Sequence, residues 1–347
     1  MTIPAIDKAI EQEAIARQGI LTKPPGALGR LETLSIRLAG MTGRLDWLPE
    51  RRAAMVFAGD HGVAAQGVSA FPQEVTAQMV LNFLAGGAAI NVLARQMGAR
   101  VTVVNAGVLS DLPDQENLVN EPVARGTADF TQGPAMTAEQ ATAAVELGRS
   151  TVKQAIEKGL DVLAVGEMGI GNTTPASAII AVLTGKPVAE VTGRGTGIAD
   201  EALQNKIAVI EQGLQVNGLS SDNLPTGMDV LAKIGGYEIG AMAGAMIGAA
   251  ENRVPVIVDG LISTAAALVA AELAPGVEQY FLAGHHSVEP GHIYALEKLG
   301  ITPLVDLGLR LGEGTGAVLA MPILEAAMRT LNEMATFADA GVSNKDD

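Results

Sequence analysis

The chain has 347 residues, of which 48% are hydrophobic, so it is long enough for one large core or two domains and is not a disordered chain. A net charge of −15 and an aromatic content of only 3% argue against nucleic acids and anionic membranes as ligands. There is no cysteine, which excludes disulfides, thiolate metal sites and a cysteine nucleophile.

Residues 1–50 contain two amphipathic helical patterns and no convincing strand. The polar N-terminal segment lacks the continuous apolar core of a signal peptide, so we expect a cytoplasmic protein. Further along, we predict strands at 53–59, 100–107, 160–167, 254–260, 278–284 and 301–308. Helices are predicted at 72–96, 137–158, 174–183, 200–213, 262–273, 290–299 and 315–334.

The alternation of strands and helices predicts the fold class. Runs that are apolar throughout are typical of parallel strands covered on both faces, so we predict a doubly wound, mainly parallel α/β sheet. We expect this large domain to span residues 51–314, and residues 1–50 and 315–347 to form a small helical lobe. Ligands of such sheets bind at the carboxyl ends of the strands, where the motifs described below are found.

The end of the first predicted strand, in FAGDHGVAAQGVSAFPQEVT at 57–76, carries polar residues. Asp60 and His61 are candidates for a base and its orienting partner, or for a turn held by Asp–backbone hydrogen bonds. Ser69, Phe71 and Gln73 surround the start of the next helix. They are candidates to line a pocket for a planar ligand.

Two glycine-rich loops predict a site for a small phosphate. In VGEMGIGNTTPASAIIAVL at 165–183, a strand leads through glycines into a helix, and such a loop presents free backbone amides to an anion. Its candidate ligands are Gly169, Gly171, Asn172, Thr173 and Thr174. In VTGRGTGIADE at 191–201, Gly195 and the cation of Arg194 are candidates. Alternatively, the first loop is a tight turn without a ligand and the second is a flexible connector.

One apolar segment, GGYEIGAMAGAMIGAA at 235–250, resembles a membrane span in composition. Its uncharged stretch of 12 residues is too short for a hydrocarbon core about 30 Å thick. Glycines at 236, 240, 244 and 248 share one helix face and permit close approach of another backbone. We predict a buried helix packed on a neighbouring helix or at a subunit interface.

Three of the four histidines lie in AGHHSVEPGHIYAL at 283–296. His285, Glu289 and His292 have the spacing that holds zinc on one helix face, but a Pro-Gly pair interrupts the helix before His292. We therefore expect a structural or substrate-adjacent polar loop, with no metal. Asp259, at the end of the strand predicted at 254–260, is either a pocket-rim acid or a helix cap.

The segment LGLRLGEGTGAVLA at 307–320 places Glu313 between two glycines, just before a helix. This residue lies either in a solvated turn or where a flat substrate approaches its carboxylate closely. Glu167 likewise follows a strand. Two carboxylates above a phosphate-binding loop suit chemistry at a sugar carbon, where one takes a proton and negative charge stabilises an oxocarbenium-like centre.

Six separated motifs together carry a family resemblance. GEMGIGNTTPASA, VTGRGTG, FAGDHGV, PVIVDG, GHHSVEPGH and LGLRLGEGTGA resemble those of the nicotinate-nucleotide–dimethylbenzimidazole phosphoribosyltransferases, usually called CobT. The resemblance runs from KPPGALGRLE at 23–32 to the C-terminal helix, which is essentially the whole chain. It implies a homodimer with a Rossmann-like large domain and a small helical domain, and a reaction that needs no metal or redox cofactor.

The resemblance implies transfer of phosphoribose from nicotinate mononucleotide to 5,6-dimethylbenzimidazole, giving α-ribazole 5′-phosphate and nicotinate for the lower ligand of cobalamin. It implies that Glu313 is the general base and that Glu167 lies close to the base and the ribose. By the same resemblance, Lys206 lies near the phosphate. The slot for the benzimidazole is expected to contain Ser69, Phe71 and Gln78.

Two other classes of protein compete with this interpretation. A nucleotide-binding or regulatory protein needs the glycine-rich loops but gives no role to Glu313. An NAD-dependent oxidoreductase needs the dinucleotide fingerprint, whose glycine spacing residues 160–190 do not meet, and they do not match the Walker phosphate loop either. The sequence leaves open whether dimethylbenzimidazole, adenine or another base is the preferred acceptor.

Overall fold

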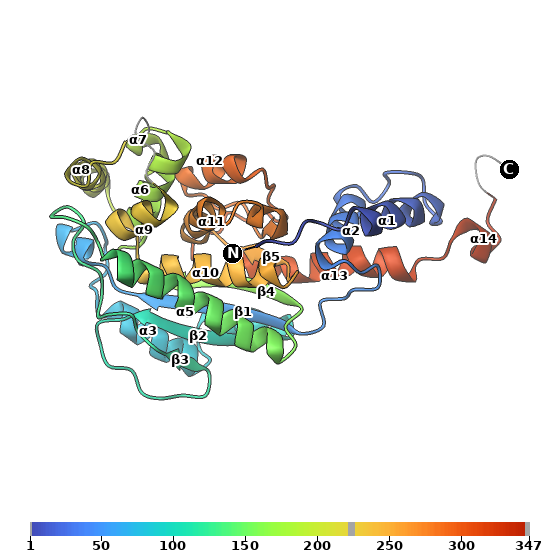
Figure 1. The fold of residues 1–347 in the computed structure, drawn as a ribbon, viewed down its shortest axis with the longest axis horizontal. Helices are drawn as coiled ribbons and strands as arrows, with labels where there is room; N and C mark the ends of the chain where they lie inside the picture. The colour runs from blue at the N-terminus through green and yellow to red at the C-terminus, as the bar shows by residue number, and fades with distance from the viewer. Residues whose placement is uncertain (1, 221–225, 344–347) are drawn as a thin grey trace.

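The computed structural model describes residues 2–220 and 226–343. Its centre is a six-stranded sheet in the order β3-β2-β1-β4-β5-β6 (Figure 1). The strands are β1 (Arg52–Gly59), β2 (Ala99–Gly107), β3 (Leu118–Asn120), β4 (Val162–Met168), β5 (Val256–Val258) and β6 (Phe281–Ala283). All five pairings are parallel, which confirms the predicted doubly wound α/β class. The direction of strand addition reverses between β1 and β4, where such sheets bind ligands.

Helices cover both faces of the sheet. One face carries α3 (Val75–Leu84), α4 (Ala89–Gln96) and α13 (Thr315–Glu333), and the other carries α10 (Tyr237–Glu251) and α11 (Leu261–Leu273). Around α10 and α11 lie α5 (Ala138–Glu157), α6 (Thr173–Thr184), α7 (Val188–Val191), α8 (Asp200–Val216), α9 (Gly227–Ile234) and α12 (Pro290–Leu299). The remaining helices are α1 (Lys8–Ile20), α2 (Arg30–Thr42) and α14 (Phe337–Ala340).

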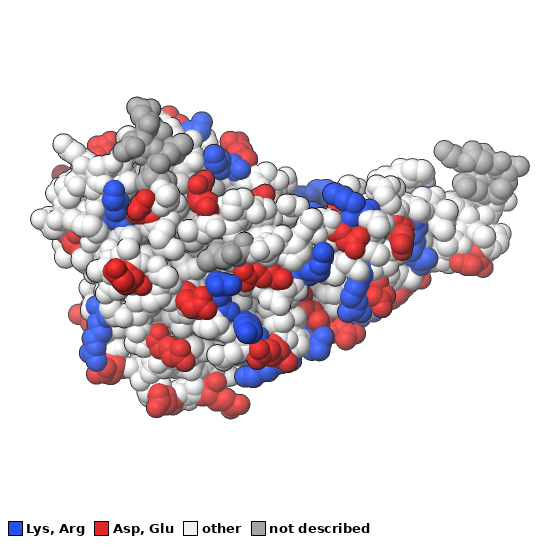
Figure 2. Space-filling model, viewed as in Figure 1, with Lys and Arg blue, Asp and Glu red and all other residues white. Residues whose placement is uncertain are grey.

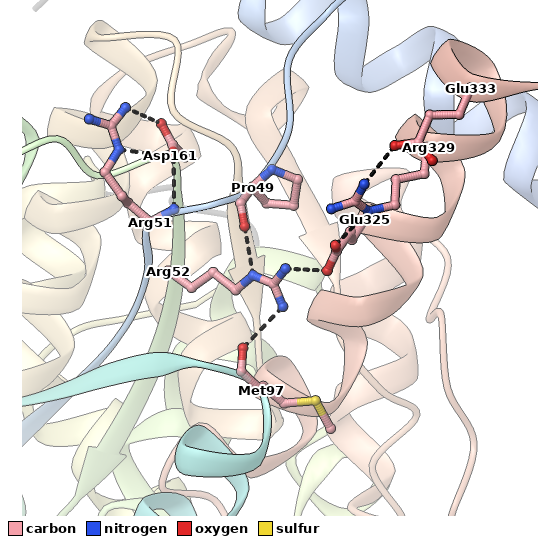
Figure 3. A network of polar contacts seen from close by, with 8 residues as sticks. All are labelled: Pro49, Arg51, Arg52, Met97, Asp161, Glu325, Arg329 and Glu333. Atoms are coloured by element: carbon pink, nitrogen blue, oxygen red, sulfur yellow. Dashed lines mark hydrogen bonds and ion pairs between the residues drawn. The ribbon is translucent and has the colours of Figure 1, made fainter.

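Helices from the two ends of the chain lie together at one side of the molecule (Figure 1). α2 packs on both α1 and α13, and Arg17 of α1 donates a hydrogen bond to the carbonyl oxygen of Leu331 in α13. At the start of β1, Arg52 pairs with Glu325 and so ties the sheet to the same helix (Figure 3). α13 therefore contacts both parts of the chain, and the domain boundary at residue 315 stays a prediction.

Several predicted elements differ from the structure. Residues 301–308 do not form a strand; they run beside β6 through a single bridge between Val305 and His285, and Pro303 has no N–H to extend the pairing. The predicted helix at 72–96 is two helices, because Gly86 takes a φ of 77° after α3. Of the run at 278–284 only β6 is paired, and Val277–Tyr280 form a 3₁₀ helix. The short elements β3, α7, α9 and α14 are not among the predicted strands and helices.

The surface carries mixed charge, and one helical stretch has the composition of a membrane span. On the face drawn in Figure 2, Lys and Arg of the described residues are interspersed with Asp and Glu rather than gathered in one basic patch. Residues 75–96 are long and apolar enough to cross a membrane by length and composition alone. The stretch is broken into α3 and α4, both of which pack on the sheet, so it is not a clear span.

The glycine-rich segment at 235–250 forms α10, which is buried and packs along α5 (Figure 1). The two backbones touch at Gly148 and Gly244. A Cβ atom on Gly148 would lie 1.8 Å from the carbonyl oxygen of Ala241, and one on Gly244 would lie 1.8 Å from that of Val145. The glycine face therefore contacts a helix of the same chain and does not provide a subunit interface.

We expect Gly148→Ala to lower the free energy of unfolding by about 3 kcal/mol or more, because the added methyl group has no room and the helices must separate. Gly19→Ala is the matched control, since Gly19 is an exposed helical glycine whose added Cβ would contact nothing within 4 Å. Its stability should be unchanged or slightly raised. Urea unfolding of both variants measures the difference, and equal stabilities would contradict the described contact.

Candidate active site

A cavity of about 650 Å³ lies beyond the carboxyl ends of the central strands. Its wall is built from the end of β4 and the loop after it (residues 167–170, 172 and 173), and from segments after β5 (260–262) and β6 (285, 287 and 289). Residues 308–313, before α13, complete it. Phe71, Val75 and Met79 add an apolar side, and Gly195 and Thr196 add the second glycine-rich loop. The two predicted phosphate loops and both candidate carboxylates thus contribute to one cavity.

Glu313 lies in a strained turn at the edge of this cavity. Its φ is 63°, between Gly312 at 86° and Gly314 at 88°, a left-handed conformation that costs a non-glycine residue about 1–3 kcal/mol. Such strain persists where the surroundings hold it, and it clusters at functional sites. The residue is only 6% exposed, and its Oε2 accepts a hydrogen bond from the Ile90 amide at 3.2 Å. The solvated-turn interpretation of Glu313 is therefore wrong.

Two contacts hold the Glu313 turn in place. The turn lies directly on β4, because a Cβ on Gly166 would lie 2.2 Å from the carbonyl oxygen of Glu313. On the other side, the Asp259 carboxylate accepts hydrogen bonds from the amides of Gly314 at 3.2 Å and Ala317 at 2.9 Å. Asp259 is thus the cap of α13 rather than a pocket-rim acid.

Glu167 enters the same cavity from the end of β4. It accepts a hydrogen bond from the Asn172 side chain, and Gly312 leaves room for its carboxyl group. Burial raises the pKa of Glu167 to about 8; the Asn172 bond opposes this, and the nearby Asp259 adds to it. The raised pKa favours the protonated form of Glu167 at neutral pH.

Of the predicted phosphate ligands, Gly169, Asn172, Thr173 and Gly195 line the cavity. Lys206 is fully buried behind this wall and donates hydrogen bonds to Thr173 Oγ1 at 2.7 Å and to a backbone carbonyl at 3.2 Å. Burial lowers the pKa of Lys206 to about 8, against the attraction of Glu289. Lys206 thus faces the cavity only through the Thr173 hydroxyl group.

Besides Lys206, three of the predicted phosphate ligands do not line the cavity. Arg194 donates to the carbonyl oxygen of Ile198 at 2.8 Å and pairs with Asp200, so its guanidinium points away. Gly171 and Thr174 also lie outside the cavity wall, and Thr174 is fully buried. Among the described residues, the cation on the cavity wall is instead Arg310, which stands three residues before Glu313 and is not among the predicted site residues.

The predicted base pocket is only partly assembled by the structure. Phe71 lines the cavity, and Ser69 accepts a hydrogen bond from its amide at 3.2 Å while lying 3.4 Å from the Thr196 hydroxyl group. Gln78 is exposed on α3 and does not line the cavity. Val75 and Met79, four residues apart, present the helix face that does, a spacing that the sequence already contains.

The remaining candidates form buried polar contacts. His61 pairs with Glu238 at 2.6 Å, and Asp60 accepts from the Leu109 amide at 2.8 Å, so neither lines the cavity. Glu289 accepts from the Gly195 amide at 3.0 Å, whereas His292 accepts from the amide of Ser287. Within residues 2–220 and 226–343, no three acidic or histidine side chains converge as metal ligands.

Comparison with known proteins identifies the family. A family model described as "Phosphoribosyltransferase" matches residues 3–342. The chain is 59% identical to the nicotinate-nucleotide–dimethylbenzimidazole phosphoribosyltransferase of Chloroflexus aggregans over 343 residues, which cover 99% of this chain and 96% of that protein. The chain belongs to the nicotinate-nucleotide–dimethylbenzimidazole phosphoribosyltransferase family. The Geobacter sulfurreducens protein of this name is 53% identical, covering 98% of this chain and 96% of its own. The crystal structure of a Thermus thermophilus member superimposes with a TM-score of 0.92 at 47% identity, over 98% of this chain and 100% of that chain.

We expect Glu167→Gln to change how stability depends on pH. Between the ordinary pKa of 4.5 and the folded pKa of about 8, the folded wild type holds more protons than the unfolded chain, so its stability falls as pH rises. Glutamine does not titrate. The variant should therefore gain stability over the wild type across this window, by on the order of 1 kcal/mol per pH unit, and level off above it.

Urea unfolding at several pH values between about 5 and 9 measures this difference. Glu297→Gln, which changes an exposed glutamate on α12, is the control and should follow the wild type. A Glu167→Gln curve parallel to the wild type would contradict the raised pKa.

Proposed function

We propose that the protein transfers phosphoribose from nicotinate mononucleotide to 5,6-dimethylbenzimidazole, with Glu313 as the general base. The single observation that carries the proposal is one cavity in which a buried, strained carboxylate faces two glycine-rich loops. The names of the relatives, which are 53–59% identical over nearly the whole chain, give the substrates. A cavity of about 650 Å³ suits a mononucleotide together with a small planar base.

The phosphate of nicotinate mononucleotide is proposed to bind at the loops after β4 and α7. Backbone amides at the start of α6 and the Thr173 hydroxyl group provide donors for the anion. Because Lys206 donates to the oxygen of Thr173, the hydroxyl hydrogen is free to point at the ligand. Arg310 adds a cation from the opposite loop, close to the Gly195 carbonyl group at 3.3 Å.

The acceptor base is proposed to lie against the apolar side of the cavity. Phe71, Val75 and Met79 provide a surface without charge, and Leu309 and Leu311 extend it. The exposed Phe71 ring is available for stacking on a flat heterocycle. This arrangement leaves the ring N–H of the benzimidazole facing Glu313.

In the proposed reaction, one ring nitrogen of the benzimidazole attacks C1′ and forms the new C–N bond. The bond from C1′ to nicotinate breaks, and its electron pair goes to the pyridine nitrogen. The other benzimidazole nitrogen gives its proton to Glu313, which completes the charge balance. Attack from the face opposite nicotinate converts a β-nucleotide into an α-nucleotide. Positioning of the two substrates supplies much of the acceleration.

Glu313 and Glu167 are proposed to have different roles because they differ in protonation. Burial raises the pKa of Glu313, against the hydrogen bond from Ile90, and Asp259 raises it further. A carboxylate with a raised pKa is a stronger base, and it must be deprotonated in the free enzyme. Glu167, for which the protonated form is favoured at neutral pH, is proposed to donate a hydrogen bond to the ribose or to the departing nicotinate.

We also propose that the protein is a cytoplasmic homodimer with a small helical lobe. The family resemblance supports this assembly, and α1 and the segment after α14 expose Ile15, Ile20 and Val342 at the end of the molecule. Gly244 and its neighbours on α10 do not support it, because they contact α5. Light scattering of the purified protein measures the assembly state.

Glu313→Gln should lower kcat by about 10²-fold or more, since glutamine keeps the shape of the side chain but cannot take the proton. Nicotinate release from nicotinate mononucleotide and dimethylbenzimidazole, followed by chromatography, measures the rate. Glu297→Gln is the exposed control. Equal rates for Glu313→Gln and wild type would remove Glu313 as the base, and no product from either would contradict the proposed reaction.

Lys206→Met should raise KM for nicotinate mononucleotide about tenfold or more, because the Thr173 hydroxyl group loses the donor that orients it. Arg194→Gln should change KM less than about threefold, because the guanidinium already pairs with Asp200 away from the cavity. Steady-state kinetics with varied nicotinate mononucleotide compares the two. A larger effect at Arg194 than at Lys206 would restore Arg194 as a phosphate ligand and contradict the proposed role of Lys206 behind Thr173.

A further inference from the structure

Asp259 is a buried carboxylate that does not line the cavity but contacts the segment carrying Glu313. It is 1% exposed and follows β5 directly. Its two oxygens accept from the amides of Gly314 and Ala317, one on the Glu313 turn and one in the first turn of α13. The imidazole beside it is that of His285, whose Nε2 lies 3.7 Å from Asp259 Oδ1. A helix cap alone does not require burial, because caps are common at the protein surface.

We propose that Asp259 is a positioning residue for Glu313: its carboxylate binds the amides of Gly314 and Ala317 and so holds the strained backbone beside Glu313. The inference rests on the proposed role of Glu313 in proton transfer. Asp259 acts through Glu313 and through the backbone, since it does not reach the cavity.

The geometric part of the inference follows from the strain. A φ of 63° at Glu313 relaxes unless neighbouring contacts prevent it. On one side the turn rests on Gly166 of β4, and on the other the carboxylate of Asp259 binds the amide of Gly314. Hydrogen bonds to an ionised carboxylate are stronger than neutral ones. Without this one, the carboxylate of Glu313 is free to shift, and a shift of about 1 Å in a catalytic group costs roughly 10²-fold in rate.

Asp259 also affects Glu313 electrostatically, together with the other charged groups around it. Asp259 raises the pKa of Glu313 in addition to burial, and it raises that of Glu167 in the same way. The other charged or titratable groups on the cavity wall are Glu167, His285, Glu289 and Arg310. From α4 the contact is the uncharged amide of Ile90. Of these neighbours, Asp259 is the carboxylate that substitution removes without changing the cavity wall. Burial raises the pKa of Asp259 itself, and His285 and the amides of Ala317 and Gly314 oppose this and favour its charged form.

The test is the pH profile of kcat/KM for wild type, Asp259→Asn and Asp306→Asn. With Asp259→Asn, kcat should fall about tenfold or more, with KM for nicotinate mononucleotide within about threefold. The acid limb, which reports deprotonation of Glu313, should move to lower pH by about half a unit or more, because the nearby negative charge is gone. Asp306→Asn removes an exposed carboxylate that also faces a histidine, and it should follow the wild type.

A merely structural role would lower the yield or the stability without moving the acid limb. A second readout is Asp259→Asn placed in the Glu313→Gln background, where the further loss in kcat should be less than about twofold, because Asp259 acts through Glu313. Asp259→Glu keeps the charge but displaces the oxygens, so kcat should fall while the acid limb stays in place. If Asp259→Asn does not fold, Asp259→Glu carries the test, and wild-type kcat in it overturns the proposal.

An unmoved acid limb, or the same loss in kcat in both backgrounds, overturns the inference about Asp259. If Glu313→Gln is inactive and Asp259→Asn behaves like Asp306→Asn, only this inference fails and the proposed function stands. If Glu313→Gln is as active as the wild type, the role of Glu313 fails, and the inference about Asp259 fails with it.

Discussion

The backbone around Glu313 rests directly on strand β4, and the arrangement of the cavity depends on this contact. No side chain fits on residue 166, because its Cβ would lie 2.2 Å from the Glu313 carbonyl oxygen. The contact brings the end of β4 and the start of α13 together, so that Glu313 and Glu167 reach one cavity from segments about 150 residues apart in the chain. The glycine loops then join the cavity because β4 leads into the first of them.

Burial of polar groups gives this cavity its chemistry. Glu167 and Lys206 both have a pKa near 8 for the same reason, because removal from water disfavours the charged form of each. Their hydrogen-bond partners, Asn172 and Thr173, are neighbours on the loop that enters α6. Both side chains are therefore oriented by hydrogen bonds to the same loop. Such preorganised groups need little rearrangement during the reaction, which is a main source of catalytic power.

The sequence predicts the fold well where strands are long and apolar throughout. It predicts β1, β2 and β4 closely, whereas 301–308 is apolar but pairs through one bridge, and β3 is too short for its pattern to be recognised. Among the site residues, Glu167 and Glu313, each next to a glycine, reach the cavity, whereas Asp60 and Asp259, which also stand beside glycines, do not. Arg194 does not line the cavity, because its guanidinium pairs with Asp200. Spacing in the sequence does not determine which carbonyl or carboxylate group a long side chain will contact.

The roles of buried acids could not be read from the sequence for a related reason. Asp259 directly follows β5 and Glu167 lies near the end of β4, yet Asp259 caps a helix and Glu167 lines the cavity. The difference depends on which backbone amides lie within reach, and these come from α13, more than fifty residues further along the chain. Likewise, the glycine face of α10 is compatible with a neighbouring helix or a second subunit, and only the packing against α5 decides between them.

The left-handed backbone at Glu313 also bears on how this enzyme can be evolved. Glycine adopts a φ of 63° freely, so the fold itself favours a residue that has no carboxylate at this position. If variants are selected for heat resistance alone, glycine in place of Glu313 should therefore be enriched, because it relaxes the turn while removing the proposed base. Thermostabilised descendants of this protein need turnover, as well as melting temperature, in the selection.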